Sequence, residues 1–249
     1  MLKLLEEIFE KGTIEINSNG ERIELHSHTP KEQGVFLQNL YEKVNPVRSL
    51  EVGLALGIST LFILEKAREK LKTDKTHIVI EPLPWGNAAI HNIQKEGLSG
   101  YVDIRNALSD VVIPAMYLND ERIQFAYVDT TKIFDTIMQD FYFIDKILDV
   151  GGVIVFDDAS TGGISMVMRF INSLPHYKIV ERFQQIEVSK TYSIGAKLFE
   201  GLLSFLPFKS RYMPNYSFKT THQLGLDYRC IAFKKIAVDT RSWDWVKPF

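Results

Sequence analysis

Residues 48–60 read Arg-Ser-Leu-Glu-Val-Gly-Leu-Ala-Leu-Gly-Ile-Ser-Thr, and this stretch decides the fold. Residues 48–52 are expected to form a strand, glycines follow at two positions, and a helical pattern begins at Ser59. Glycine lets the backbone turn sharply and approach a ligand closely, and the N–H groups of a first helical turn suit a carboxylate or a phosphate. Many α/β proteins also pass from strand to helix through glycine. The stretch alone therefore fits either a binding turn or a structural connection.

The alternation of strands and helices continues along the chain. Further strands are expected at residues 77–81, 101–105, 125–129, 153–157, 177–183 and 228–236. Short β-branched runs that alternate with helical patterns are typical of a parallel sheet covered on both faces. The sequence thus predicts an α/β fold, a doubly wound, Rossmann-like, mostly parallel seven-stranded sheet with helices on both faces and an antiparallel strand at its C-terminal end.

Two helix boundaries are predicted from capping signals. Thr29 is expected to cap a helix that runs to about Val44, with Pro30 in the first turn and Glu32 completing a capping box. Apolar residues at helical spacing follow residue 134, and the Gly151-Gly152 pair is expected to end that second helix.

The length of 249 residues fits one domain, expected to span residues 1–249. Residues 1–45 are expected to form a helical or hairpin extension. Residues about 187–227 interrupt the strand pattern with a long connection, which includes the apolar stretch at 196–206. Connections of this length usually have a function, so the insertion is expected to be a lid or an oligomer contact.

Composition excludes several protein classes. The formal net charge is −2, so no global positive field attracts nucleic acid or an anionic membrane. The single cysteine, Cys230, cannot form an internal disulfide, and no apolar stretch approaches the roughly 18 residues of a membrane span. We therefore expect a cytoplasmic protein that acts on a small molecule and binds neither nucleic acid nor a membrane. A homodimer is the expected oligomer, on general symmetry statistics.

Acidic residues lie at the carboxyl ends of three predicted strands, where doubly wound sheets bind ligands. Glu81 ends the second strand and could accept the hydroxyl protons of a ribose. Asp129 ends the fourth strand, and Asp157 and Asp158 end the fifth. Clustered carboxylates repel one another, so a hard divalent cation such as Mg²⁺ is expected among the three aspartates. Alternatively, Asp157 or Asp158 caps the next helix and Asp129 contacts only cofactor or solvent.

Together these residues resemble the class I S-adenosylmethionine (SAM)-dependent methyltransferases. Within that class they are similar to the small-molecule O-methyltransferases related to catechol O-methyltransferase and to the metal-dependent sugar O-methyltransferases of antibiotic pathways. The resemblance covers about residues 33–235. It rests on Glu51-x-Gly53-x-x-x-Gly57-x-Ser59, on Glu81, on Asn106-Ala107-Leu108-Ser109, and on Asp129 with Asp157-Asp158.

The resemblance implies a role for each of these positions. Glu51, Gly53, Gly57 and Ser59 would hold the amino-acid end of SAM, Glu81 the ribose, and Ala107 and Leu108 the adenine. Asp129 would lie between the cofactor and a cation bound with Asp157 and Asp158. Lys132 falls where the catechol enzymes carry a general-base lysine. The chain departs from many relatives in having Thr130-Thr131 after Asp129, where they carry a histidine.

The sequence hence favours methyl transfer from SAM to a hydroxyl of a sugar or a phenol, assisted by a divalent cation. Two alternatives remain. An NAD-dependent oxidoreductase would share the sheet, the glycine turn and the ribose acid, although Leu54-Ala55-Leu56 lacks the second glycine of a dinucleotide fingerprint. A non-catalytic SAM-binding protein could act as an interaction module through the apolar stretch at 196–206.

Overall fold

The computed structural model describes residues 1–70, 76–82, 87–186 and 219–247. The chain groups into two compact units. Unit 1 comprises Met1–Thr130 and Gln139–Ile154, and unit 2 comprises Thr131–Met138 and Val155–Phe249. The prediction of a single domain over residues 1–249 stays a prediction. Residues 187–218 of the predicted insertion lie outside the described residues.

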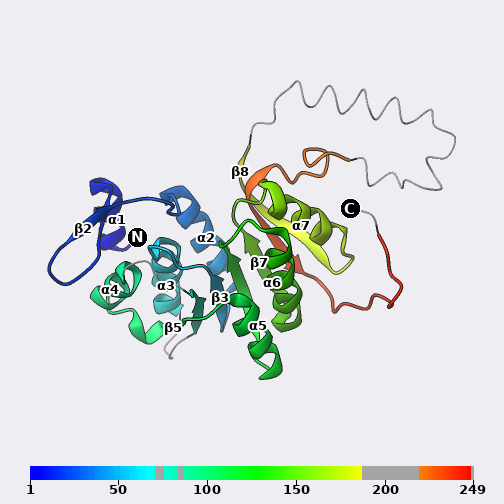
Figure 1. The fold of residues 1–249 in the computed structure, drawn as a ribbon, viewed down its shortest axis with the longest axis horizontal. Helices are drawn as coiled ribbons and strands as arrows, with labels where there is room; N and C mark the ends of the chain where they lie inside the picture. The colour runs from blue at the N-terminus through cyan, green and yellow to red at the C-terminus, as the bar shows by residue number, and fades with distance from the viewer. Residues whose placement is uncertain (71–75, 83–86, 187–218, 248–249) are drawn as a thin grey trace. The chain divides into compact units, whose positions relative to one another are not determined.

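Seven strands form one mixed sheet, which confirms the predicted fold class. The order across the sheet is β5-β4-β3-β6-β7-β9-β8 (Figure 1). Parallel pairs join β3 to β4, β4 to β5 and β3 to β6, whereas β8 and β9 are antiparallel. The strands are β3 (Ser49–Val52), β4 (His77–Ile80), β5 (Val102–Arg105), β6 (Ile123–Val128), β7 (Leu148–Phe156), β8 (Tyr177–Gln185) and β9 (Tyr228–Lys235).

Helices connect the strands, as the periodicity predicts. They are α1 (Lys3–Lys11), α2 (Lys31–Val44), α3 (Ile58–Lys70), α4 (Ala88–Lys95), α5 (Ser109–Leu118), α6 (Phe134–Ile147) and α7 (Gly162–Ser173). A short 3-10 turn, η1, occupies Ser99–Tyr101. Among the described helices, none is long and apolar enough to cross a bilayer.

Both capping predictions are corrected by the structure. Pro30, not Thr29, is the N-cap of α2, and no side chain caps that end. Pro30 keeps an extended ψ of 157°, so the helix starts one residue later than the capping box requires. Helix α6 ends at Ile147, before Gly151, and the chain enters β7 directly. A Cβ on Gly152 would lie 2.9 Å from the backbone oxygen of Gln124 in β6, so the glycine serves strand packing and not helix termination.

The N-terminal extension packs onto unit 1. Figure 1 shows α1 and the hairpin of β1 (Thr13–Glu15) and β2 (Arg22–Glu24) beside α3 and α4. Buried Leu5 and Ile8 of α1 share one apolar cluster with Phe62 of α3 and Ile93 of α4. Burying such side chains stabilises by roughly 1.5–3 kcal/mol each, which fixes the segment that leads into α2.

Strand β3 lies where the chain reverses its direction across the sheet. From β3 the chain adds β4 and β5 on one side, and then returns to place β6 on the other side. Ligands of open α/β sheets bind beyond the carboxyl ends of the strands at such a switch point. The carboxyl end of β3 in unit 1 is therefore the first place to look for a site.

Candidate functional site

The strand register aligns the predicted polar residues of unit 1 along one edge. Val52 of β3 pairs with Ile80 of β4 and with Val128 of β6, and Ile80 pairs with Arg105 of β5. The residues that directly follow these positions are Gly53, Glu81, Asn106 and Asp129. Four consecutive strand ends thus present the glycine turn, an acid on either side of it, and the segment predicted to border adenine.

Gly53 allows the close approach between β3 and β6. Its φ is +97°, and an added Cβ would overlap the backbone carbonyl oxygen of Asp129. The amide of Asp129 also donates a 2.9 Å hydrogen bond to the Val52 carbonyl. Gly57 serves a different contact, because its φ is +76° and its Cβ would lie 2.7 Å from that of Ala89 in α4. Both positions require glycine for backbone reasons.

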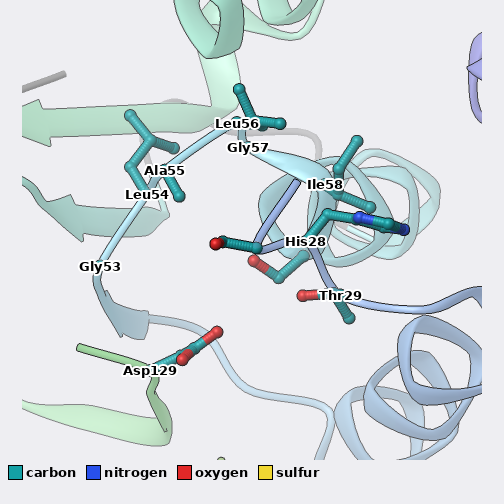
Figure 2. A pocket seen from close by; sticks show the side chains of 11 residues that line it. His28, Thr29, Gly53, Leu54, Ala55, Leu56, Gly57, Ile58 and Asp129 are labelled. Carbon is teal, nitrogen blue, oxygen red and sulfur yellow. The ribbon is translucent and has the colours of Figure 1, made fainter. Parts of the chain in front are cut away.

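A pocket opens at this turn within unit 1. It has about 270 Å³ of empty space, part of which is open to solvent, and is lined by residues 27–29, residues 53–59 and Asp129. Figure 2 shows the Asp129 carboxylate and the Thr29 hydroxyl directed toward the same space. Unlike Gly53, Gly57 and Ser59, Glu51 is not among the lining residues.

Glu51 lies beneath the pocket, fully buried in β3. Its carboxylate accepts hydrogen bonds from the hydroxyls of Ser59 at 2.5 Å and Thr60 at 2.8 Å. His77 of β4 places Nε2 at 2.9 Å from the same carboxylate. Three donors satisfy a buried charge that would otherwise be costly. Glu51 therefore contacts the residues that line the pocket, and its predicted role toward the cofactor stays a prediction.

Glu81 connects the end of β4 to the glycine turn. Its Oε2 accepts backbone N–H groups from Leu54 at 3.0 Å and Ala55 at 3.3 Å. A carboxylate that accepts backbone N–H groups holds the turn in place, and its remaining lone pairs can accept hydroxyl protons. Its position beside Gly53 agrees with a ribose-binding role, which stays a prediction.

Asp129 is oriented by two buried side chains. The Tyr127 hydroxyl lies 3.4 Å from Asp129 Oδ2, and the Gln33 amide donates to that hydroxyl at 3.0 Å. Gln33 belongs to α2, so this helix supports the side chain that lines the pocket. A carboxylate fixed at the pocket wall suits the ammonium group of an amino acid or a cation.

The predicted adenine segment follows β5. Ala107 is half-buried and Leu108 is 56% exposed. The Ala107 amide donates to the Arg105 carbonyl at 3.0 Å, and this turn leads into α5. An exposed leucine beside polar strand ends is an apolar surface on which a purine base could pack, and the role toward adenine stays a prediction.

The remaining predicted residues lie in unit 2, where two cationic side chains already meet the acids. Asp157 directly follows β7 and is buried, with Arg229 Nε at 3.6 Å and Cys230 Sγ at 3.2 Å from its Oδ1. Asp158 has a φ of +47° and forms an ion pair with Lys132. Carboxylate oxygens are suitable ligands for Mg²⁺, but the Asp158 carboxylate is already paired with the Lys132 ammonium. A bound cation would have to displace that ammonium.

The sequence pattern does not predict two features of unit 1, namely the place of residues 27–29 in the pocket lining and the buried contacts of His77. The segment at 27–29 lines the pocket, and the ring of His28 lies 6.2 Å from that of Phe9 in α1. The strand predicted at residues 77–81 implies no further role for His77. Neither has a local signal, since each acquires its place through contacts with residues far away in sequence. The nearest hint is that His77 is a polar residue at the start of an otherwise apolar strand.

Comparison with known proteins agrees with this geometry. Residues 50–159 match the model of a family described as "Methyltransferase domain". The matched residues include the glycine turn, Glu81, Asp129 and both later aspartates. Among curated proteins, none matches the chain.

Solved structures share the fold of this chain. An O-methyltransferase from Bacillus cereus in complex with SAH (S-adenosylhomocysteine) is 21% identical, with a TM-score of 0.58 over 74% of this chain and 86% of that one. SAH-bound methyltransferase PaMTH1 from Podospora anserina is 15% identical, with a TM-score of 0.57 over 72% and 83%. The O-methyltransferase TomG from Streptomyces achromogenes, involved in tomaymycin synthesis and in complex with SAM, is 19% identical, with a TM-score of 0.54 over 63% and 75%. At these identities the likeness establishes the fold.

Proposed function

We propose that this protein transfers the methyl group of SAM to a hydroxyl of a small molecule, a sugar or a phenol. The observation that carries the proposal is the row of strand ends in unit 1, with Gly53 between Glu81 and Asp129. The pocket at residues 53–59 would take the amino-acid end of SAM, Glu81 the ribose, and Ala107 and Leu108 the adenine. The named O-methyltransferases of similar fold support oxygen as the acceptor atom.

The reaction is a direct displacement at the methyl carbon. The acceptor oxygen forms a bond to that carbon, the carbon–sulfur bond breaks with its electron pair moving to sulfur, and the hydroxyl proton leaves to a base. The products are the methyl ether, neutral SAH and one proton. Because the sulfonium already activates the methyl group, the protein must mainly align the reactants and remove the proton.

Asp129, Asp157 and Asp158 would hold the divalent cation in this proposal. When bound, a divalent cation lowers the pKa of an acceptor hydroxyl and fixes its oxygen. Lys132 is the proposed base, and its ion pair with Asp158 must open before its amine can accept a proton. If no cation is needed, that same ammonium supplies the positive charge beside Asp158. Metal dependence therefore decides between these two roles of Lys132.

Turnover with labelled SAM tests the proposal. A panel of phenols and sugars is incubated with the protein and methyl-labelled SAM, with chelator, and with chelator followed by excess Mg²⁺. We expect labelled ether from at least one acceptor, loss of turnover on chelation and recovery with Mg²⁺. Asp157→Asn should lose the Mg²⁺ response, whereas Asp135→Asn, an exposed acid of α6, should keep it.

Each failure has its own meaning. Turnover that is unchanged by the chelator would show that the reaction needs no cation, while the proposal of methyl transfer would still hold. Binding of SAH without turnover across the panel would favour the interaction module, and stabilisation by NAD alone would favour the oxidoreductase. We further propose that the protein is a cytoplasmic homodimer. The location rests on the composition, and the dimer rests on general symmetry statistics. Light scattering tests the dimer, and cell fractionation tests the location.

A further inference from the structure

A chain of buried hydrogen bonds runs from β4 to the pocket wall. His77 is the first residue of β4, and it pairs in register with Ser49 of β3. Residues two apart on a strand point to the same face, so Ser49 and Glu51 both face this histidine. The imidazole Nδ1 lies 2.9 Å from Ser49 Oγ, and Nε2 lies 2.9 Å from Glu51 Oε2. All three residues are 0% exposed.

An ionised Glu51 and a neutral His77 together give each hydrogen bond one direction. A carboxylate only accepts, so the imidazole carries a proton on Nε2 and donates it to Glu51. In a neutral imidazole Nδ1 then accepts the hydroxyl proton of Ser49. The orientation of Glu51 in turn affects Ser59, because Oε1 of Glu51 accepts a hydrogen bond from the Ser59 hydroxyl at 2.5 Å. Ser59 lies in the first turn of α3 and lines the pocket.

We infer that His77 is a positioning residue of the cofactor pocket, which acts through Glu51 to fix the orientation of the Ser59 hydroxyl. The inference rests on the proposed function, since it assumes that the pocket binds the amino-acid end of SAM. Without a donor at His77, a buried carboxylate loses one of three partners and moves toward solvent or toward its two hydroxyl donors. Either movement changes the geometry of Ser59 at the pocket wall.

Two variants of His77 separate donation from packing. His77→Leu fills the space without a donor, and His77→Gln offers an amide N–H in place of the Nε2 proton. Calorimetric titration with SAH should show a Kd about tenfold higher for His77→Leu and within about twofold of wild type for His77→Gln, since tenfold corresponds to one lost hydrogen bond to a charged group. With SAM in a turnover assay, KM should rise in the leucine variant while kcat changes less than about twofold.

A matched control excludes a general loss of stability. Ile144→Ala removes buried volume in α6, and it should lower Tm without changing the Kd for SAH. If His77→Leu lowers Tm but binds SAH as wild type does, the positioning role is wrong and His77 is only structural. Equal weakening in the glutamine and leucine variants would show that packing, and not donation, matters.

A second variant tests the inference if His77→Leu does not fold. Ser49→Ala removes the hydroxyl partner of Nδ1, and it should raise the Kd for SAH about threefold; an unchanged Kd would overturn the inference. Titration of the wild-type chain separates this inference from the proposed function. Absence of SAH binding to wild type defeats the proposed function, whereas wild-type binding that His77→Leu and Ser49→Ala fully retain defeats only the role of His77.

Discussion

Substitution of Gly53 by alanine should damage both the fold and the pocket. The residue has a φ of +97°, which costs an alanine roughly 1–3 kcal/mol. The new Cβ would also overlap the Asp129 carbonyl oxygen and lie 2.9 Å from its carbon, and overpacking of this kind costs typically 1–3 kcal/mol. We expect the free energy of unfolding to fall by about 4 kcal/mol and the apparent Tm by about 12 °C, at about 3 °C per kcal/mol.

Gly97→Ala is the matched control for this change. Gly97 has a φ of +67°, and nothing lies within 4 Å of an added Cβ, so only the backbone term applies. We expect a loss of about 1 kcal/mol. In Gly53→Ala, the ends of β3 and β6 must separate, so the Kd for SAH should rise at least tenfold, while Gly97→Ala should bind as wild type does. Thermal unfolding and calorimetry measure both effects. If the two variants lose the same stability and bind SAH with the same Kd, the close approach of β3 and β6 does not explain why residue 53 is glycine.

Three further changes test other parts of the account. Burial, with a contribution from Asp110, raises the pKa of Asp140 from 3.8 to about 6, so the folded chain holds this proton to a higher pH than the unfolded chain. The free energy of unfolding should thus fall by up to about 3 kcal/mol as pH rises from about 4 to about 6, and Asp140→Asn should remove that loss in urea titrations; parallel pH curves for the two proteins would contradict the shift. Glu81→Gln keeps the shape but loses the charge, so calorimetry should give an SAH Kd about tenfold higher with little change in Tm, and an unchanged Kd would remove Glu81 from the ribose site. Lys132→Met should reduce kcat at least tenfold with an unchanged SAH Kd, and full kcat would remove Lys132 as the base.

Much of unit 1 follows from the sequence because its signals are local. The strand, the glycine turn and the helix at residues 48–60 form as the spacing indicates, and the acids Glu81 and Asp129 fall at strand ends. Parallel register then aligns those ends without further information. Period and composition sufficed here, because each strand is a short apolar run bounded by turn residues.

Features that depend on contacts distant in sequence were not predictable. Gln33 reaches Tyr127 across 94 positions, and His77 reaches Ser49 across 28. The local signal was also misleading at the start of α2. The capping box predicts Thr29 as the N-cap, but the N-cap is Pro30, and Thr29 lines the pocket. At Gly151-Gly152, packing against β6 overrode the usual use of glycine as a helix terminator. Tertiary contacts decide such positions, and a single sequence does not contain them.

The most direct test of the central claim is hydrogen exchange of the backbone amides with and without saturating SAH. Exchange measured by mass spectrometry reports protection segment by segment. We predict slower exchange within residues 52–59, 81–82, 106–109 and 128–130, the carboxyl ends of β3, β4, β5 and β6, with the exposed helix surfaces unchanged. Protection located elsewhere, or no protection at SAH concentrations that saturate binding, would contradict the assignment of the cofactor site.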